Sequence, residues 1–209
     1  MNEYENKYYK EGYNVIAGTD EAGRGPLVGP VVAACVVLPK GYTNPEINDS
    51  KKITEKKREK LYDVIMKDAL AVEVCEISAK EIDEINILEA SRKAMKTAYE
   101  KVNKRLKVDI LLTDAMKIDL DIPVIDIIKG DAKSITIAAA SIIAKVTRDR
   151  ILLELDKKYP EYEFAKHKGY PTKRHLELLE KYGVLDIYRK TYKPVKNIIE
   201  RKKHEDFKK

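Results

Sequence analysis

Residues 13–38 read YNVIAGTDEAGRGPLVGPVVAACVVL, and this stretch decides the fold. Its two ends, 13–20 and 31–38, are short and apolar, and the second is rich in the β-branched residues that favour a buried strand. A connection rich in glycine and proline, 22–30, joins them. Because this connection leads from one strand directly into another, it predicts a β-hairpin.

The rest of the chain alternates between helical and strand patterns. Helical spacing covers 54–69, 78–103 with a break near Asn86, and 134–159, whereas strand patterns cover 70–77, 108–113 and 124–128. Beyond Pro160, short helices are predicted near 172–182 and 195–201. The order indicates an α/β sheet covered by helices, with residues 1–158 as the main domain and residues 159–209 as a helical, basic region packed on it.

Composition excludes several classes of protein. The chain has 209 residues, of which 44% are hydrophobic and 36% charged, so it can bury a core of ordinary size. Its longest apolar run, 31–38, is far shorter than the roughly 20 residues of a membrane span, and residues 1–10 lack the apolar part of a secretory signal. We therefore expect a cytoplasmic protein without membrane contact. Cys35 and Cys75 lie in separate apolar runs, which argues against a disulfide or a zinc site.

The net charge of +6 is concentrated toward the C-terminus. Residues 151–209 carry 16 basic and 10 acidic side chains, whereas residues 1–150 carry 25 of each. The same C-terminal segment contains the aromatic residues Tyr159, Tyr162, Phe164, Tyr170, Tyr182, Tyr188 and Tyr192. Basic and aromatic side chains together are typical of a surface that binds nucleic acid. A solvated helical tail with its aromatic residues in the core is the alternative interpretation.

Four carboxylates fall where an α/β sheet places its chemistry. Asp20 and Glu21 end the first predicted strand, Asp114 ends the fourth, and Asp131 precedes the long helix. Acids at the ends of neighbouring strands converge, and they repel one another unless cations share the site. Oxygen ligands without His or Cys favour Mg²⁺ or Mn²⁺, and two such ions about 3.5–4 Å apart suit phosphodiester hydrolysis. Each acid taken singly also fits a turn or a helix cap.

The connection between the first two strands contains a glycine loop, Gly23-Arg24-Gly25, followed by Gly29. Its spacing is close to that of a dinucleotide-binding loop, but such a loop must open a helix, and this one leads into the strand 31–38. Glycines beside carboxylates allow backbone groups to approach a ligand closely, which suits recognition of a sugar hydroxyl. Turn geometry alone accounts for part of the same pattern.

Residues 20–34, DEAGRGPLVGPVVAA, resemble the signature of type 2 ribonuclease H, the ribonuclease HII family. Further motifs match in the same order: DSKK at 49–52, Asp114 after an apolar strand, KGD at 129–131, AAASIIAKVTRD at 138–149, KGYPT at 168–172 with His175, and YRKTYKPV at 188–195. The resemblance covers roughly residues 13–196. It implies an α/β fold, the ribonuclease H-like mixed five-stranded sheet with an antiparallel second strand, flanked by helices and followed by a helical C-terminal region.

The resemblance also implies an activity. Such enzymes cleave the RNA strand of RNA–DNA hybrids and cut on the 5′ side of a single ribonucleotide in duplex DNA, leaving a 3′-hydroxyl and a 5′-phosphate. By similarity, the catalytic residues and the ligands of two Mg²⁺ or Mn²⁺ ions are Asp20, Glu21, Asp114 and Asp131. Asp20 would bridge the ions, Asp131 would serve the ion that activates water, and Glu21 and Asp114 would serve the leaving-group ion. The implied roles are ribonucleotide excision repair and DNA replication.

The substrate-binding residues that the resemblance implies are Gly23, Arg24, Gly25, Lys51, Lys52 and Tyr170. The backbone of the glycine loop would contact the ribose 2′-hydroxyl, and the tyrosine would stack on the sugar beside the junction. The two lysines would hold phosphates, with a solvated lysine pair as the alternative. His175 is expected to be structural or a phosphate contact.

Two other functions fit parts of the sequence. Ribonuclease HIII has a similar core but carries an extra N-terminal substrate-binding domain, for which the region before Tyr13 leaves no room. A non-catalytic nucleic-acid-binding module would keep the fold and the basic surface, but it would need a defect at acids that are all present. We expect a monomer, because no exposed apolar stripe is left once the core is built.

Overall fold

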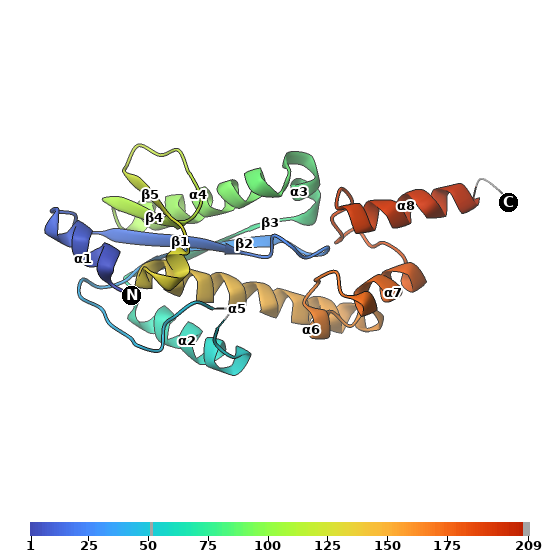
Figure 1. Cartoon of the computed structure of the whole chain (residues 1–209), viewed down its shortest axis with the longest axis horizontal. Coiled ribbons are helices and arrows are strands. Elements are labelled where there is room, and N and C mark those ends of the chain that lie inside the picture. The colour runs from blue at the N-terminus through green and yellow to red at the C-terminus, as the bar shows by residue number, and fades with distance from the viewer. Residues whose placement is uncertain (51, 207–209) are drawn as a thin grey trace.

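The computed structural model describes residues 1–50 and 52–206, and its centre is a mixed sheet that lies between helices (Figure 1). The strands are β1 (Ile16–Ala22), β2 (Val31–Val37), β3 (Ala71–Ile77), β4 (Ile110–Asp114) and β5 (Val124–Ile127), in the order β3-β2-β1-β4-β5. β2 runs antiparallel to both of its neighbours, whereas β1, β4 and β5 are parallel. The predicted mixed five-stranded sheet with an antiparallel second strand is confirmed.

The helices cover both faces of this sheet. They are α1 (Glu3–Lys10), α2 (Glu55–Asp68), α3 (Ala79–Ile85), α4 (Ile87–Arg105), α5 (Ile135–Lys158), α6 (Phe164–His167), α7 (Lys173–Tyr182) and α8 (Lys193–Asp206), with 3₁₀ turns η1 (Gly130–Ala132) and η2 (Pro160–Tyr162). α4 lies on one face, and α2 and α5 lie on the other (Figure 1). Side chains alternate along β2, so that Ala33 and Cys35 pack with α4 while Ala34 and Val36 pack with α5.

α5 approaches the sheet closely, and this approach positions the site. The first ten residues of α5 are all buried, so this part of the helix is covered on every side. Gly18 of β1 permits the contact, because a Cβ atom at Gly18 would lie 2.4 Å from the backbone carbonyl carbon of Thr136. Asp20 follows two residues later on the same face of β1, so its side chain lies against α5.

The first strand differs from its prediction. It begins at Ile16 instead of Tyr13 and continues to Ala22, because its pairing with β2 extends to Ala22 opposite Val32. The expectation that the strand ends at the two acids is therefore wrong. Asp20 and Glu21 lie inside β1, where successive side chains leave on opposite faces.

No sequence pattern predicts α1, whose eight residues are too few for a clear apolar stripe. Contacts with the rest of the chain hold it in place. The buried Glu5 carboxylate accepts hydrogen bonds from the Thr136 N–H over 3.1 Å and from the Ser134 hydroxyl over 2.5 Å, both at the start of α5. Because a carboxylate stabilises a helix N-terminus, α1 anchors the end of α5 that follows Asp131.

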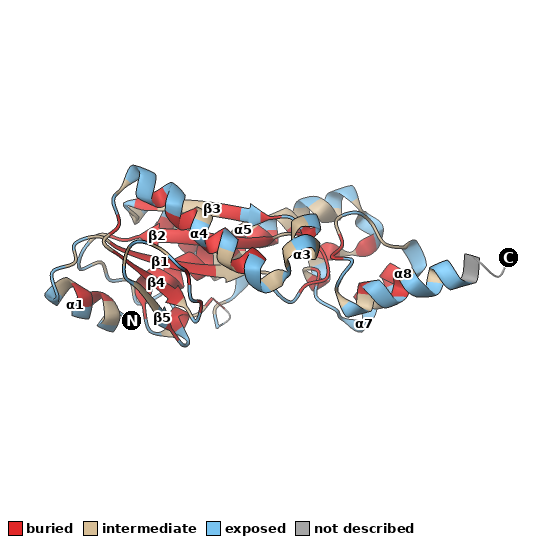
Figure 2. Ribbon diagram, turned by 90° about the horizontal axis from the view of Figure 1, so that it is seen from above, coloured by how far each residue is buried: buried red, intermediate tan, exposed pale blue. Residues whose placement is uncertain are grey.

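The segments from η2 to α8 form an extension at one end of the sheet, and Figure 2 shows α8 largely exposed on its outer side. Three of its aromatic residues, Tyr162, Phe164 and Tyr188, are buried in a cluster that also contains Leu27 and Leu152. These three belong to the core, as the alternative interpretation of the composition predicts, and they are not free to stack on bases. The last helix, α8, is longer than the predicted 195–201. Among the described residues, no helix is long and apolar enough to cross a membrane.

Candidate active site

Three carboxylates meet at one edge of the sheet. Asp20 comes from β1, Asp114 ends β4, and Asp131 lies in η1 directly before α5. β1 and β4 are parallel neighbours, so their carboxyl ends lie side by side. One carboxylate oxygen from each residue lies within 4.8 Å of the other two, and in the described part of the chain this is the group of acids spaced to hold a metal ion. The N-cap of α5 is Ser134, so Asp131 does not serve as its cap.

The turns that carry these acids have unusual backbone conformations. Ala115, which follows Asp114, has a φ of 48°, and Lys129, two residues before Asp131, has a φ of 58°. Residues other than glycine rarely adopt this left-handed region, and those that do are concentrated at functional sites. The Gly130 N–H donates a hydrogen bond to Asp114 Oδ1 over 2.7 Å. The loop that carries Asp131 therefore also orients Asp114.

Glu21 lies beside this three-acid group and not within it. The Arg24 guanidinium lies 3.5 Å from Glu21 Oε1. Glu21 Oε2 is buried, and it has no hydrogen-bond partner among the described residues. A buried carboxylate oxygen without a partner is costly, and a cation would satisfy it.

The crowding of the acids is visible in the electrostatics of Asp20. Burial, followed by the charges of Glu21 and Asp114, raises the pKa of Asp20 well above its ordinary value, although hydrogen bonds from Ser141 and from the Glu21 N–H oppose the rise. Burial also raises the pKa of Glu21, against the lowering effect of Arg24. A bound divalent cation favours the ionised form of such groups. The all-oxygen donor set therefore fits a hard divalent cation of the Mg²⁺ or Mn²⁺ type.

A cavity of about 370 Å³ lies against Asp20, Glu21 and Asp114. Its other lining residues are Ala22, Gly23, Arg24, Gly25, Ser50, Ala115, Ser141, Lys145, Arg148 and Tyr170. The glycine loop joins β1 to β2 as the predicted hairpin connection, and a Cβ atom at Gly25 would lie 3.5 Å from the Tyr170 ring. This ring is 43% exposed. The structure thus brings three of the four predicted acids, the glycine loop and Tyr170 to one cavity, and the fourth acid, Asp131, lies beside it in the three-acid group.

The structure describes one of the two lysines that are predicted to contact phosphates. Lys51 is outside the described residues. Lys52 does not line the cavity; its exposed ammonium lies 4.0 Å from Asp49 Oδ2. Ser50 does line the cavity, and its hydroxyl oxygen lies 2.9 Å from that of Ser141. The DSKK segment therefore borders the site through Ser50.

Three basic residues of the site, Lys145, Arg148 and Arg189, have no predicted role. Ser141, Lys145 and Arg148 recur at helical spacing and form one polar stripe on the otherwise apolar part of α5, which is the sequence signal for the first two basic residues. Lys145 lines the cavity, and its Nζ lies 2.6 Å from Asp149 Oδ1. No comparable signal identifies Arg189, because its partners lie in the glycine loop at the other end of the chain.

The histidines next to Tyr170 are structural. His175 is fully buried, with Nδ1 2.8 Å from the Tyr170 carbonyl oxygen and Nε2 2.8 Å from the Tyr188 hydroxyl, and its ring stacks on that of His167. Burial lowers the pKa of His175 to about 4, so this ring is neutral at pH 7. His175 therefore supports the segment that carries Tyr170 and is not placed to act on a substrate.

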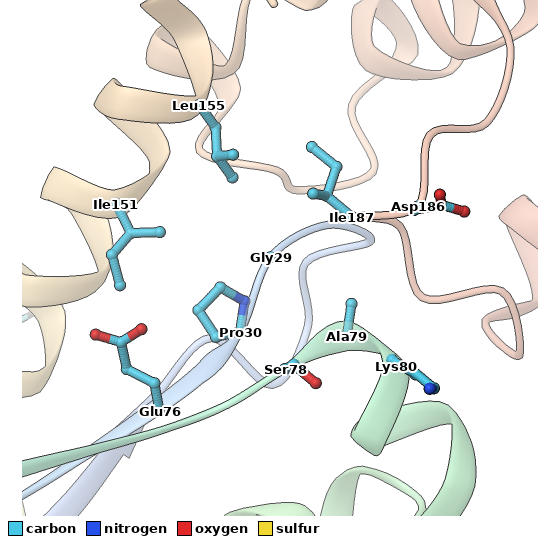
Figure 3. Close-up of a pocket in the computed structure, with 10 residues that line it drawn as sticks. All are labelled: Gly29, Pro30, Glu76, Ser78, Ala79, Lys80, Ile151, Leu155, Asp186 and Ile187. Carbon is cyan, nitrogen blue, oxygen red and sulfur yellow. The ribbon is translucent and has the colours of Figure 1, made fainter. Parts of the chain in front are cut away.

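A second hollow, of about 390 Å³, lies at the far end of the glycine connection, beside Gly29 and Pro30 (Figure 3). Ile151, Leu155 and Ile187 make its lining mostly apolar. It lacks the group of converging acids found at the first cavity. We therefore place the chemistry at the carboxylate cavity.

Comparison with known proteins supplies the family. The model of the family described as ribonuclease HII matches residues 17–195. The chain belongs to the ribonuclease HII family. A ribonuclease HII from Caldanaerobacter subterraneus subsp. tengcongensis is 60% identical over 193 residues, which cover 92% of this chain and 79% of that protein. Among solved structures, the ribonuclease H2 of Pyrococcus horikoshii has a TM-score of 0.79 and 32% identity, over 90% of this chain and 98% of that one.

Membership of the ribonuclease HII family decides between the functions left open by the sequence. The chain is a ribonuclease H endonuclease, and this family is divalent-metal dependent and acts on RNA–DNA hybrids. The interpretation as a non-catalytic binding module is therefore wrong. A Bst ribonuclease HIII structure with Mn²⁺ has a TM-score of 0.69 but only 15% identity, over 91% of this chain and 70% of that one. That likeness concerns the fold alone.

Proposed function

We propose that this chain cleaves the RNA strand of RNA–DNA hybrids and cuts on the 5′ side of single ribonucleotides embedded in duplex DNA, leaving a 3′-hydroxyl and a 5′-phosphate. Two Mg²⁺ or Mn²⁺ ions, held by Asp20, Glu21, Asp114 and Asp131, support the reaction. One observation carries the proposal: the three-acid group lies beside a cavity that the glycine loop and Tyr170 also line. A centre suited to hydrolysis is thus next to groups suited to recognising a sugar.

The backbone orients the carboxylates before any ligand binds. The Glu21 N–H donates to Asp20 Oδ1 over 2.7 Å, and the Gly130 N–H donates to Asp114 Oδ1 over 2.7 Å. Such hydrogen bonds fix the direction of the remaining ligand oxygens. Divalent ions held by these carboxylates would lower the pKa of the attacking water and would stabilise the negative charge on the leaving 3′-oxygen. No general base from the protein is required, which agrees with the structural roles of the histidines.

The proposed recognition of the sugar uses two other parts of the cavity lining, the glycine loop and Tyr170. The backbone of Gly23, Arg24 and Gly25 offers polar groups to a ribose 2′-hydroxyl, which DNA lacks. The exposed Tyr170 ring stacks on the adjacent sugar. Lys51 and Lys52 hold phosphates.

This function divides the chain into two parts. Residues 1–158 supply the catalytic domain, and residues 159–209 supply substrate contacts through Tyr170. The protein works as a monomer in ribonucleotide excision repair and DNA replication. These roles rest on the same substrate specificity, so one assay bears on all of them.

The test is a gel assay on a labelled DNA duplex that contains one ribonucleotide, with Mg²⁺ or Mn²⁺ and with an EDTA control. We expect a metal-dependent cut directly 5′ of the ribonucleotide. Cleavage of a long RNA–DNA hybrid without cleavage of this duplex would contradict the proposed specificity and the roles given to Tyr170 and the glycine loop. Cleavage that persists in EDTA would contradict the metal site.

A further inference from the structure

Two buried arginines, Arg148 and Arg189, lie behind the glycine loop. Their exposed fractions are 1% and 0%. Neither forms an ion pair with a carboxylate of the described residues. All but one of their hydrogen bonds go to backbone carbonyl oxygens, which is an unusual use of two guanidinium groups in a protein interior.

Arg189 fixes the direction of the peptide units in the loop. Its Nη2 donates to the Gly23 carbonyl over 2.7 Å, its Nη1 to the Arg24 carbonyl over 3.0 Å, and its Nε to the Gly29 carbonyl over 3.1 Å. In a planar trans peptide, the N–H points away from the C=O of the same unit. The N–H groups of Arg24 and Gly25 are therefore directed away from Arg189, and in the described part of the chain neither has an acceptor.

Arg148 joins the glycine connection to the segment that carries Tyr170. Its Nη2 donates to the Val28 carbonyl over 3.1 Å and its Nε to the Pro30 carbonyl over 3.2 Å, while its Nη1 donates to the Lys168 carbonyl over 3.1 Å. Lys168 is two residues before Tyr170. One side chain thus sets the distance between the loop and the tyrosine ring across the cavity.

Gly23 shows how tightly this arrangement is packed. Its φ is 98°, and a Cβ atom there would lie 2.1 Å from Arg148 Nε. The loop backbone therefore rests directly on the guanidinium. Burial and the nearby Arg189 lower the pKa of Arg148 to about 10, so this side chain keeps its positive charge at pH 7 behind the glycine loop.

We propose that Arg148 and Arg189 are positioning residues for ribose selection, which act by turning the glycine-loop N–H groups toward the substrate and by holding Tyr170 at a fixed distance from them. This inference rests on the proposed function. It adds that the specificity depends on a buried guanidinium pair, which acts through the backbone carbonyls that it holds. The hydrogen bonds of the pair converge on the glycine loop and on the segment that carries Tyr170, which are the two parts proposed to contact the sugar. A role in folding alone would not require this convergence.

Arg189→Lys tests the proposal, because lysine keeps the charge but cannot reach three carbonyls with a planar fork. Tyr192→Phe is a milder second variant: the Tyr192 hydroxyl donates to the Arg24 carbonyl over 2.7 Å and accepts from Arg189 Nη1 over 3.0 Å, and the change removes both bonds while it keeps Arg189. Arg201→Lys, the same substitution at an exposed arginine paired with Glu180, is the matched control. Three quantities are measured: kcat/KM on the single-ribonucleotide duplex, Kd for an all-DNA duplex of the same sequence, and the rise in Tm caused by Mn²⁺.

We expect Arg189→Lys to lower kcat/KM roughly tenfold and Tyr192→Phe about threefold, because small displacements of positioning groups are costly. The Kd for all-DNA duplex and the Mn²⁺-induced rise in Tm should stay unchanged in both variants, and the control should match the wild type. A purely structural role would leave kcat/KM of the folded fraction unchanged, or would weaken binding of the all-DNA duplex by a similar factor, and either result overturns the proposal. If Arg189→Lys does not fold, an unchanged kcat/KM in Tyr192→Phe overturns it.

The proposed function can fail separately. In that case the wild-type chain leaves the single-ribonucleotide duplex uncut, and kcat/KM is measured on an RNA–DNA hybrid instead. The same loss in Arg189→Lys on the hybrid, with binding of all-DNA duplex unchanged, would still support the positioning role. An unchanged kcat/KM on the hybrid would overturn it.

Discussion

Two charged regions lie side by side in this molecule, and each gathers like charges in a different way. The three-acid group brings Asp20, Asp114 and Asp131 together, and burial, followed by the charges of Glu21 and Asp114, raises the pKa of Asp20. The guanidinium pair, Arg148 and Arg189, is satisfied by carbonyls of the glycine connection. The acids thus gain from a bound cation, whereas the arginines are complete within the fold. The three-acid group is therefore suited to binding a cation, whereas the guanidinium pair holds the backbone of the glycine connection in position.

The largest effect is expected for Asp20→Asn, which removes a charge from the three-acid group. We expect kcat to fall by roughly 10³-fold or more, because the proposed metal site loses a ligand. In EDTA, the same variant should be more stable than the wild type by about 1 kcal/mol, since a buried and repelled charge is removed. Gel assays and urea unfolding measure the two quantities. Asp126→Asn, at an exposed acid, is the control, and a fully active Asp20→Asn would contradict the account.

The packing of Arg148 against the glycine loop is tested by two glycines with the same φ. Gly12 and Gly23 both have a φ of 98°, but a Cβ atom meets nothing within 4 Å at Gly12 and meets Arg148 at 2.1 Å at Gly23. We expect Gly12→Ala to cost about 1 kcal/mol of unfolding free energy and Gly23→Ala about 3 kcal/mol. Urea unfolding of both variants measures the difference. Equal costs would show that the arginine does not pack against the loop as described.

A smaller effect is expected when the cavity loses the aromatic ring of Tyr170. Tyr170→Ala should lower kcat/KM on a single-ribonucleotide duplex about tenfold, because the proposed stacking on the sugar is lost. Binding of an all-DNA duplex should change little, since phosphate contacts are kept. Tyr182→Ala is the control, at a tyrosine that is 44% exposed against 43% for Tyr170. Equal losses on every substrate would remove the sugar-reading role.

The smallest effect concerns the pH dependence of stability that His175 causes, because this buried residue supports the segment that carries Tyr170. The pKa of His175 is about 4 in the folded protein against an ordinary 6.5, so the unfolded chain binds the proton more tightly. Stability should therefore fall as the pH drops from 6.5 toward 4. His175→Gln should lose less stability over this range than the exposed-site control His204→Gln, as measured by urea unfolding at each pH. Parallel pH profiles in the two variants would contradict the assignment.

The difference between the two regions also explains what the sequence predicted. Asp20 and Asp114 follow apolar strand patterns, and neighbouring parallel strands must bring their ends together, so local pattern and topology suffice for the acids. Arg189 hydrogen-bonds residues more than 150 positions away, and no local pattern encodes such a contact. The short helix α1 escaped prediction for a related reason, since Glu5 is held by Ser134 and Thr136.

The central claim is that the three-acid group is a divalent-cation site. The most direct measurement is a Mn²⁺ titration of metal-free protein, followed by thermal unfolding of the wild type and Asp114→Asn in parallel. The account predicts that the Tm of the wild type rises with Mn²⁺ concentration, because the ion binds only the folded state, and that Asp114→Asn loses most of this rise. An equal rise in Tm for the two proteins would contradict it.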